Sequence, residues 1–274
     1  MSQEHPIEPA LRWRRFVAVG DSFTEGLWGK PDPQGRPTGW ADLLAAEISA
    51  RRTAAGEAPL EYANLAVRGR LLRPILTEQL PAALRLEPDL VSIIGGGNDI
   101  LRPTVDVDTL AQSLEAAVVR ARATGADVLL ATGMDAKDSP VVRRTRSRVG
   151  VFNAHVWSIA RRHGAFVLDV WGMRSLRDWR MWASDRIHLN PEGHARVAHA
   201  ALETLGLDAD REWDAPLPPA PPVSRLAATR SNIRWAREFA IPWATRRLRR
   251  RSSGDLVTAK RPEALPLDGD RSPR

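Results

Sequence analysis

The sequence predicts an α/β protein, a three-layer α/β/α sandwich built on a five-stranded parallel sheet and followed by a basic tail that is helical and then disordered. Over residues 1–214, short apolar runs alternate with longer amphipathic patterns, which is typical of a parallel sheet covered on both faces. The stretch APLPPAPP at 215–222 ends this alternation and is too rich in Pro for helix or strand. We therefore expect one domain over 1–214 and a linker over 215–222.

Five segments are expected to form the strands. Each is short and nearly continuous in apolar residues, and each ends at Gly or at a polar turn. In chain order they are RFVAVG (15–20), EYANLA (61–66), DLVSIIG (89–95), ADVLLATG (126–133) and AFVLDV (165–170).

The intervening segments are expected to form helices that cover the sheet. Their apolar residues recur three and four positions apart, which places them on one face of a helix. They are GWADLLAAEISA (39–50), LLRPILTEQLPAAL (71–84), DTLAQSLEAAVVRARA (108–123), VGVFNAHVWSIARRH (149–163) and PEGHARVAHAALETL (191–205).

The net charge of +7 belongs entirely to the tail. From Ala215 onward there are 13 Lys and Arg against 5 Asp and Glu, a balance of +8, so residues 1–214 carry −1. The domain therefore gives no reason to expect a specific nucleic-acid partner. Residues 223–251 predict a basic amphipathic helix and 252–274 a disordered end. Such a helix could contact anionic lipid peripherally, or it could pack its apolar stripe on the domain.

Composition narrows the chemistry and the location that we expect. The chain has no Cys, which excludes disulfides, thiolate catalysis and Cys-ligated metal. No apolar run approaches the length of a membrane span, and the first residues lack the apolar core of a secretory signal. We expect a cytoplasmic protein, with membrane contact only through the tail, and the sequence does not indicate an oligomeric state.

Polar residues follow the predicted strands at the edge where ligands bind in such sheets. Ser22 follows the first strand, Gly69 the second and Asn98 the third, while Asp185 and His188 lie in one later loop. A Ser, a His and a carboxylate can act as nucleophile, base and orienting group if they meet in space. Backbone N–H groups and an Asn amide can bind the oxyanion of acyl transfer. Taken alone, Ser22 would be explained better as a helix N-cap.

Four segments together carry a family resemblance over residues 16–204. GDSF, NLAVRG, GGND and DRIH resemble, in order and spacing, the marked blocks of the SGNH hydrolase superfamily, the GDSL-type lipases and esterases, with Phe23 in place of the usual Leu. The resemblance implies a flavodoxin-like sheet and a serine esterase that works through an acyl-serine intermediate without metal or cofactor. It assigns a triad of Ser22, Asp185 and His188, and an oxyanion hole of Ser22, Gly69 and Asn98.

The substrate is expected to be a small-molecule ester, but its acyl and alcohol parts are not identified by the sequence. Small aliphatic esters, lysophospholipids, acetylated sugars and activated thioesters all present a carbonyl to the same residues. Candidate substrate-binding residues lie near the four segments: Trp28, Arg68, Trp179 and Trp182.

Two other functions are weaker alternatives. A non-catalytic ligand-binding module could use the same fold, and only an activity measurement separates it from an esterase. A metallophosphoesterase would need an upstream Asp-x-His and a His after the Asn of GGGNDI, and neither is present. Dinucleotide binding is weaker still, because the third Gly of G-x-G-x-x-G is missing.

Overall fold

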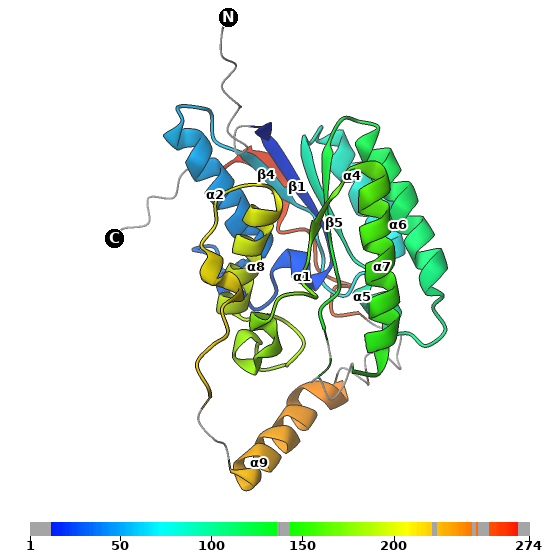
Figure 1. The fold of residues 1–274 in the computed structure, drawn as a ribbon, viewed down its shortest axis with the longest axis vertical. Helices are drawn as coiled ribbons and strands as arrows, with labels where there is room; N and C mark the ends of the chain where they lie inside the picture. Colours follow the sequence, from blue (N-terminus) through cyan, green and yellow to red (C-terminus); the bar gives the residue numbers. More distant parts are fainter. Residues whose placement is uncertain are drawn as a thin grey trace, which may run out of the picture.

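A six-stranded sheet forms the middle layer of the computed structural model (Figure 1). The structure describes residues 12–135, 137, 143–220, 224–242, 245 and 252–267. The strand order is β7-β6-β5-β1-β4-β8, and every neighbouring pair except β4 and β8 is parallel. The strands are β1 (Arg15–Gly20), β4 (Glu61–Asn64), β5 (Leu90–Ile94), β6 (Asp127–Ala131), β7 (Phe166–Leu168) and β8 (Arg261–Pro266), with a separate ribbon of β2 (Lys30–Pro31) and β3 (Pro37–Thr38).

The α/β/α sandwich is confirmed, but the prediction of five strands is wrong. The sixth strand, β8, lies in the 252–274 segment that we expected to be disordered. It runs antiparallel to β4, with Glu61 opposite Pro266 and Tyr62 opposite Leu265. Two Pro residues in RPEALP argue against a strand from sequence, yet Pro is tolerated at a sheet edge, where one side needs no donor. Residues 261–266 are ordered as a strand because they pair with β4, which the local sequence does not predict. Residues 268–274 lie outside the described residues.

Helices cover both faces of the sheet (Figure 1). One face is covered by α2 (Trp40–Ala54) and α8 (Pro191–Thr204), and the other by the helical segment 72–85 (α3, Leu72–Pro74; η2, Ile75–Gln79; α4, Leu80–Arg85), α6 (Val107–Arg122) and α7 (Arg146–His163). In β1, Phe16 and Ala18 belong to the first core, whereas Val17 and Val19 belong to the second. All four side chains are fully buried. This two-sided burial explains why the strand is continuously apolar in sequence.

The chain leaves β1 to form β4 on one side and then β5 on the other. In open α/β sheets such a reversal opens a crevice at the carboxyl ends of the central strands. The residues that follow β1, β4 and β5 therefore lie at the same edge of the sheet.

The tail folds back onto the domain. Its helical part comprises α9 (Arg225–Trp235) and η7 (Ala236–Ala240), within the predicted basic helix over 223–251 (Figure 1). Residues 243–244 and 246–251 are outside the described residues. No helix in the described ranges combines the length and the apolar character that crossing a bilayer requires.

Lys260, just before β8, ties the end of the tail to the domain. Its side chain is 9% exposed, and Nζ donates to the carbonyl oxygens of Glu25 and Pro37 at 2.5 and 2.7 Å and to Asp42 Oδ2 at 2.6 Å. Glu25 ends the short helix α1 (Ser22–Glu25), and Asp42 lies in the first turn of α2. One buried ammonium therefore joins three segments that are distant in sequence.

Replacing this ammonium is expected to destabilise the fold. Lys260→Met removes this donor from the partly buried Asp42 carboxylate, which keeps the Gly39 N–H and the Tyr62 hydroxyl, and from two carbonyl groups, so the free energy of unfolding should fall by about 1–3 kcal/mol. Urea unfolding measures it. The control is Lys30→Met, because Lys30 is exposed and should change stability by no more than about 0.5 kcal/mol. Equal stability of the two variants would contradict the role assigned to Lys260.

Candidate active site

Ser22 is presented by a tight turn between β1 and α1. A Cβ on Gly20 would lie 2.6 Å from the carbonyl oxygen of Ile94 in β5, so only Gly fits where the two strands end. Asp21 then caps α1, because its carboxylate accepts a hydrogen bond from the Phe23 N–H at 3.1 Å. The N-cap is therefore Asp21, and Ser22 is the first residue of the helix. Its hydroxyl is left available at the end of the sheet.

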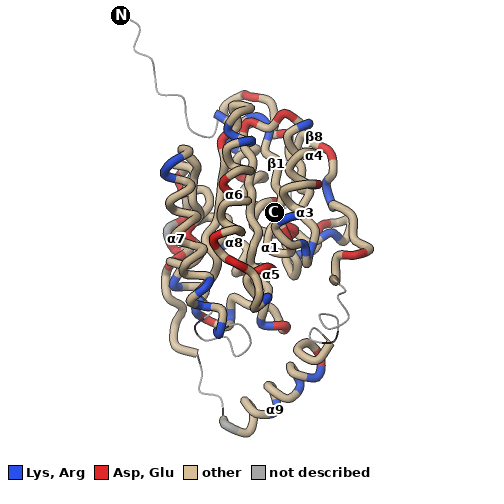
Figure 2. The backbone as a smooth tube through the Cα atoms, turned by 90° about the vertical axis from the view of Figure 1, so that its right-hand side faces the viewer, with Lys and Arg blue, Asp and Glu red and all other residues tan. Residues whose placement is uncertain are grey.

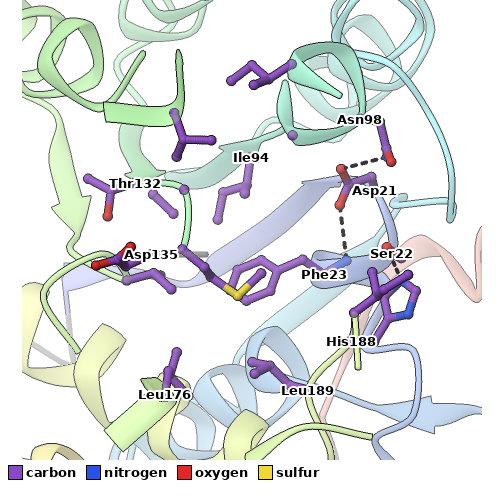
Figure 3. A pocket seen from close by; sticks show the side chains of 18 of the residues that line it. Asp21, Ser22, Phe23, Ile94, Asn98, Thr132, Asp135, Leu176, His188 and Leu189 are labelled. Atoms are coloured by element: carbon purple, nitrogen blue, oxygen red, sulfur yellow. Dashed lines mark hydrogen bonds between the residues drawn. The ribbon is translucent and has the colours of Figure 1, made fainter. Parts of the chain in front are cut away.

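The structure brings Ser22, His188 and Asp185 into one hydrogen-bonded chain. His188 Nε2 lies 2.9 Å from Ser22 Oγ (Figure 3), and His188 Nδ1 lies 2.6 Å from Asp185 Oδ2. A carboxylate accepts, so Nδ1 carries the proton and Nε2 is free to accept from the Ser22 hydroxyl. The other oxygen, Asp185 Oδ1, accepts from the backbone N–H groups of Ile187 and His188, both at 3.0 Å. The loop itself thus orients the carboxylate.

Asp185 is mostly buried but remains suited to carry a negative charge. Burial by itself would raise its pKa, but the hydrogen bond and the charge of His188, with the backbone N–H groups, outweigh burial and hold the pKa below its ordinary value. A charged carboxylate beside Nδ1 can stabilise an imidazolium.

Of the predicted oxyanion donors, Ser22 and Asn98 lie beside one cavity. Asn98, in α5 (Gly97–Ile100), donates from Nδ2 to Asp21 Oδ2 at 3.1 Å (Figure 3). It also donates from Nδ2 to the Arg70 carbonyl oxygen at 3.0 Å. Gly69 has a left-handed backbone, with φ of 74°. Within the described residues, the N–H groups of Ser22 and Gly69 have no hydrogen-bond acceptor. Ser22 and Asn98 line the cavity beside the serine, whereas Gly69 does not.

Glu25 holds the loop that contains Gly69, a role that sequence reasoning missed. The buried Glu25 carboxylate forms an ion pair with Arg68 and accepts from the Arg68 backbone N–H at 2.6 Å. Arg68, expected to bind substrate, therefore does not line the cavity and instead anchors its own loop. The pairing joins residues 43 positions apart, so no local pattern could have revealed it.

A cavity of about 240 Å³ extends from Ser22 between the ends of β5 and β6. Ser22 and His188 lie at one end, and Thr132 and Asp135 at the other (Figure 3). The wall between them is mainly apolar. It includes Phe23, Ile94, Ile100, Leu101, Ala131, Met134, Val149, Phe152, Val170, Leu176 and Leu189.

The predicted Trp residues divide between the cavity and the tail. Trp179 and Trp182 line the cavity and contact each other, with ring centroids 6.0 Å apart. Trp28 does not line it. Its ring packs edge-on against Phe239 of η7, with centroids 6.4 Å apart. Trp28 therefore contacts the tail instead of lining the cavity.

His194 is a buried neutral histidine in the cavity lining. Burial lowers its pKa to about 4, against the hydrogen bond to Leu27, which raises it. Nδ1 accepts from the Trp40 N–H at 3.3 Å, and Nε2 donates to the Leu27 carbonyl oxygen at 3.2 Å. In the described ranges, no group of three or more His, Asp or Glu residues is arranged to hold a metal ion.

Comparison with known proteins identifies relatives of this fold. The family model described as "GDSL-like Lipase/Acylhydrolase family" matches residues 18–196. No curated protein matches the chain significantly. The crystal structure of LAE5, described as an α/β hydrolase enzyme from the metagenome of Lake Arreo, Spain, superposes with a TM-score of 0.59 at 26% identity, over 70% of this chain and 95% of that chain.

Axe2, an acetylxylan esterase from Geobacillus stearothermophilus, has the same fold. A Trp-to-Ile variant of it superposes with a TM-score of 0.61 at 20% identity, over 72% of this chain and 97% of that chain. The unsubstituted enzyme superposes with a TM-score of 0.59 at 20% identity, over 71% and 95% of the two chains. Further structures are described as catalytic mutants of Axe2, in which a Ser, an Asp or a His is replaced by Ala.

Asp21 is expected to make stability depend on pH. Burial raises its pKa to about 6, although the Phe23 N–H and His188 act to lower it. The unfolded carboxyl ionises near 3.8 and the folded one near 6, so stability is lost as pH rises from about 4 to 7. Asp21→Asn does not titrate. Its free energy of unfolding relative to that of the unsubstituted protein should therefore rise by on the order of 2–3 kcal/mol over this range.

The measurement is urea unfolding of both proteins at several pH values between 4 and 8. Asp208→Asn serves as the control, because Asp208 lies on the surface after α8, and its difference from the unsubstituted protein should stay nearly constant. A constant difference for Asp21→Asn as well would contradict the raised pKa of Asp21.

Proposed function

This chain belongs to the GDSL-like lipase/acylhydrolase family and is an SGNH-type ester hydrolase, and from this premise we propose that it cleaves carboxylic esters through an acyl-Ser22 intermediate. The observation that carries the proposal is the chain of hydrogen bonds from Ser22 through His188 to Asp185, at 2.9 and 2.6 Å. The catalytic mutants of Axe2 concern the same three residue types and support the assignment.

The proposed reaction has two halves. As Ser22 Oγ attacks the ester carbonyl carbon, its proton passes to His188 Nε2, and the Asp185 carboxylate stabilises the imidazolium. The imidazolium then protonates the leaving alcohol oxygen, and the acyl group stays on Ser22. In the second half, His188 takes a proton from water, which attacks the acyl carbon. Ser22 Oγ leaves and regains its proton, and the carboxylic acid is released.

The negative oxygen formed in each half needs hydrogen-bond donors. We assign these to the N–H groups of Ser22 and Gly69, which are unpaired in the described part of the chain, and to the Asn98 amide. Both Asn98 amide hydrogens are engaged by Asp21 and Arg70. A substrate oxygen must therefore replace or share one of these acceptors, and the two bonds hold the amide in a defined direction beforehand.

The apolar cavity favours substrates with an apolar acyl chain. Its wall beside Ser22 consists mainly of aliphatic and aromatic side chains, and the polar side chains of Thr132 and Asp135 lie at the far end. An acetyl group would leave most of that wall exposed to water, whereas each added methylene that is buried contributes ~0.8 kcal/mol. The alcohol part of the ester is expected to lie outside the cavity and to leave into solvent.

The two alternative functions have less support than ester hydrolysis. Membership of a hydrolase family disfavours both the non-catalytic module and the metallophosphoesterase.

Contact between the tail and anionic lipid stays a prediction. Two aromatic side chains of the tail, Trp235 and Phe239, contact the domain, and the exposed large aliphatic ones are Leu226, Ile233, Ile241, Leu256 and Leu265.

The nucleophile and the oxyanion donor are tested by two substitutions. Ser22→Ala should lower kcat for p-nitrophenyl esters by at least ~10³-fold and abolish labelling by a serine-directed phosphonate. Asn98→Ala should lower kcat by ~10²–10³-fold while Ser22 remains labelled, because only one oxyanion donor is lost. Ser113→Ala, on the exposed side of α6, is the control and should keep full activity. Undiminished turnover by Ser22→Ala would refute the acyl-serine mechanism.

The acyl preference is tested with p-nitrophenyl esters of increasing chain length. From acetyl upward, kcat/KM should rise by up to ~4-fold per methylene and then fall once the cavity is filled. Leu176→Trp narrows the cavity and should shift the maximum to a shorter chain, with acetyl ester hydrolysis retained. A maximum at acetyl in both proteins would show that the cavity does not hold the acyl group.

A further inference from the structure

The loop that carries Asp185 and His188 contains a strained residue. We call residues 183–190 the acid–base loop. Arg186 has a φ of 58°, in the left-handed region that costs a non-Gly residue about 1 kcal/mol or more. Within the loop, the Ala183 N–H donates to the His188 carbonyl at 2.8 Å, and the Arg186 N–H donates to the Ala183 carbonyl at 3.0 Å. These two bonds close the loop but do not engage the Arg186 side chain.

The tail helix α9 supplies the contacts that the loop lacks. The Arg186 guanidinium donates to Asn232 Oδ1 at 2.7 Å and to Ser231 Oγ at 3.1 Å, and it lies 5.2 Å from the centre of the Trp235 ring. The Trp235 indole N–H donates to the Asp185 carbonyl oxygen at 2.8 Å. Three residues of one helix therefore hold two consecutive residues of the acid–base loop.

The charges at this contact favour attachment through neutral groups. Arg residues recur along α9 (Figure 2), so Arg186 approaches a helix of its own sign. The guanidinium contacts neutral groups there: the Asn232 amide oxygen, the Ser231 hydroxyl and the Trp235 ring. This is the arrangement expected of a specific attachment rather than of nonspecific attraction between opposite charges.

The same tail segment also contacts the chain close to the nucleophile. Phe239, four residues after Trp235, packs on Trp28, which follows the helix that begins with Ser22. Trp28 is itself left-handed, with φ of 68°. The tail thus contacts a segment next to the nucleophile and the loop that carries the base.

We propose that α9 is a positioning element of the esterase, in which Trp235 and Asn232 hold the acid–base loop so that Asp185 stays aligned with His188 Nδ1. The expected effect on kcat rests on the proposed esterase function. Neither residue is expected to touch the reacting atoms. Both act through the backbone of Asp185 and the side chain of Arg186.

The test uses the full chain and three substitutions in α9. Trp235→Phe keeps an aromatic ring and removes the N–H, Asn232→Leu removes the acceptor, and Asn232→Asp restores one. The control is Ile233→Ala on the same helix, because Ile233 is half exposed. Each protein is measured for kcat and KM with a p-nitrophenyl ester, for thermal unfolding, and for the downfield proton resonance of the His188 Nδ1–H without substrate.

Trp235→Phe and Asn232→Leu should each lower kcat by about 2–10-fold, the effect of one lost hydrogen bond, with KM changed less than about 2-fold. The Nδ1–H resonance should shift or broaden in both. Asn232→Asp and Ile233→Ala should keep the kcat and the resonance of the unsubstituted protein. A general loss of stability would not reproduce this pattern, because Asn232→Asp restores only the acceptor.

Unchanged kcat and an unchanged resonance in Trp235→Phe and Asn232→Leu would overturn the proposal. A higher KM at constant kcat would also overturn it, since α9 would then only form part of the substrate wall. Failure of the proposed function is recognised separately. In that case Ser22→Ala stays active, whereas the resonance, which needs no turnover, still reports whether α9 holds the loop.

Discussion

The close approach of the ends of β1 and β5 is the constraint on which the site depends. Gly20 stands opposite Ile94 in the parallel pairing, with no space for a side chain between them. Gln79 completes this end of β1: its amide accepts from the Gly20 N–H at 2.8 Å and donates to the Gly20 carbonyl at 3.1 Å. The strand can therefore stop at Gly20 without unpaired backbone groups. Ser22 and Asn98 follow within a few residues of the two strand ends, which places both beside one cavity.

Buried charged groups attach the other loops to this centre. Glu25 pairs with Arg68 below Gly69, Lys260 pairs with Asp42 behind α1, and Asp185 pairs with His188. A buried charge is costly unless a partner and hydrogen bonds satisfy it, so each pair strongly favours one arrangement of the segments it joins. Asp21 differs, because only N–H groups bind it directly. Burial therefore dominates there and raises its pKa to about 6.

The tail is part of the structure around the site rather than an appendage. Its helix contacts the acid–base loop and Trp28, and its strand completes the sheet beside β4. Between these elements, the Ser252 side chain lies against Gly69, where a Cβ would come within 2.1 Å of Ser252 Oγ. A side chain at Gly69 would therefore have to displace the tail as well as adopt a left-handed backbone.

The sequence by itself determined the layered α/β fold and the segments that carry the candidate site. Apolar periodicity is a local property, so the five strands in the domain and the helices between them could be located without knowing their neighbours. Asp185 and His188 are three residues apart in one loop, and their pairing was therefore predictable. Only the tertiary structure decided that 261–266 is a strand, that Arg68 forms an ion pair with Glu25, and that the Trp28 ring packs against Phe239. Each of these pairings joins residues more than 40 positions apart, and the partner was selected by the space and the unpaired groups that the folded domain presents.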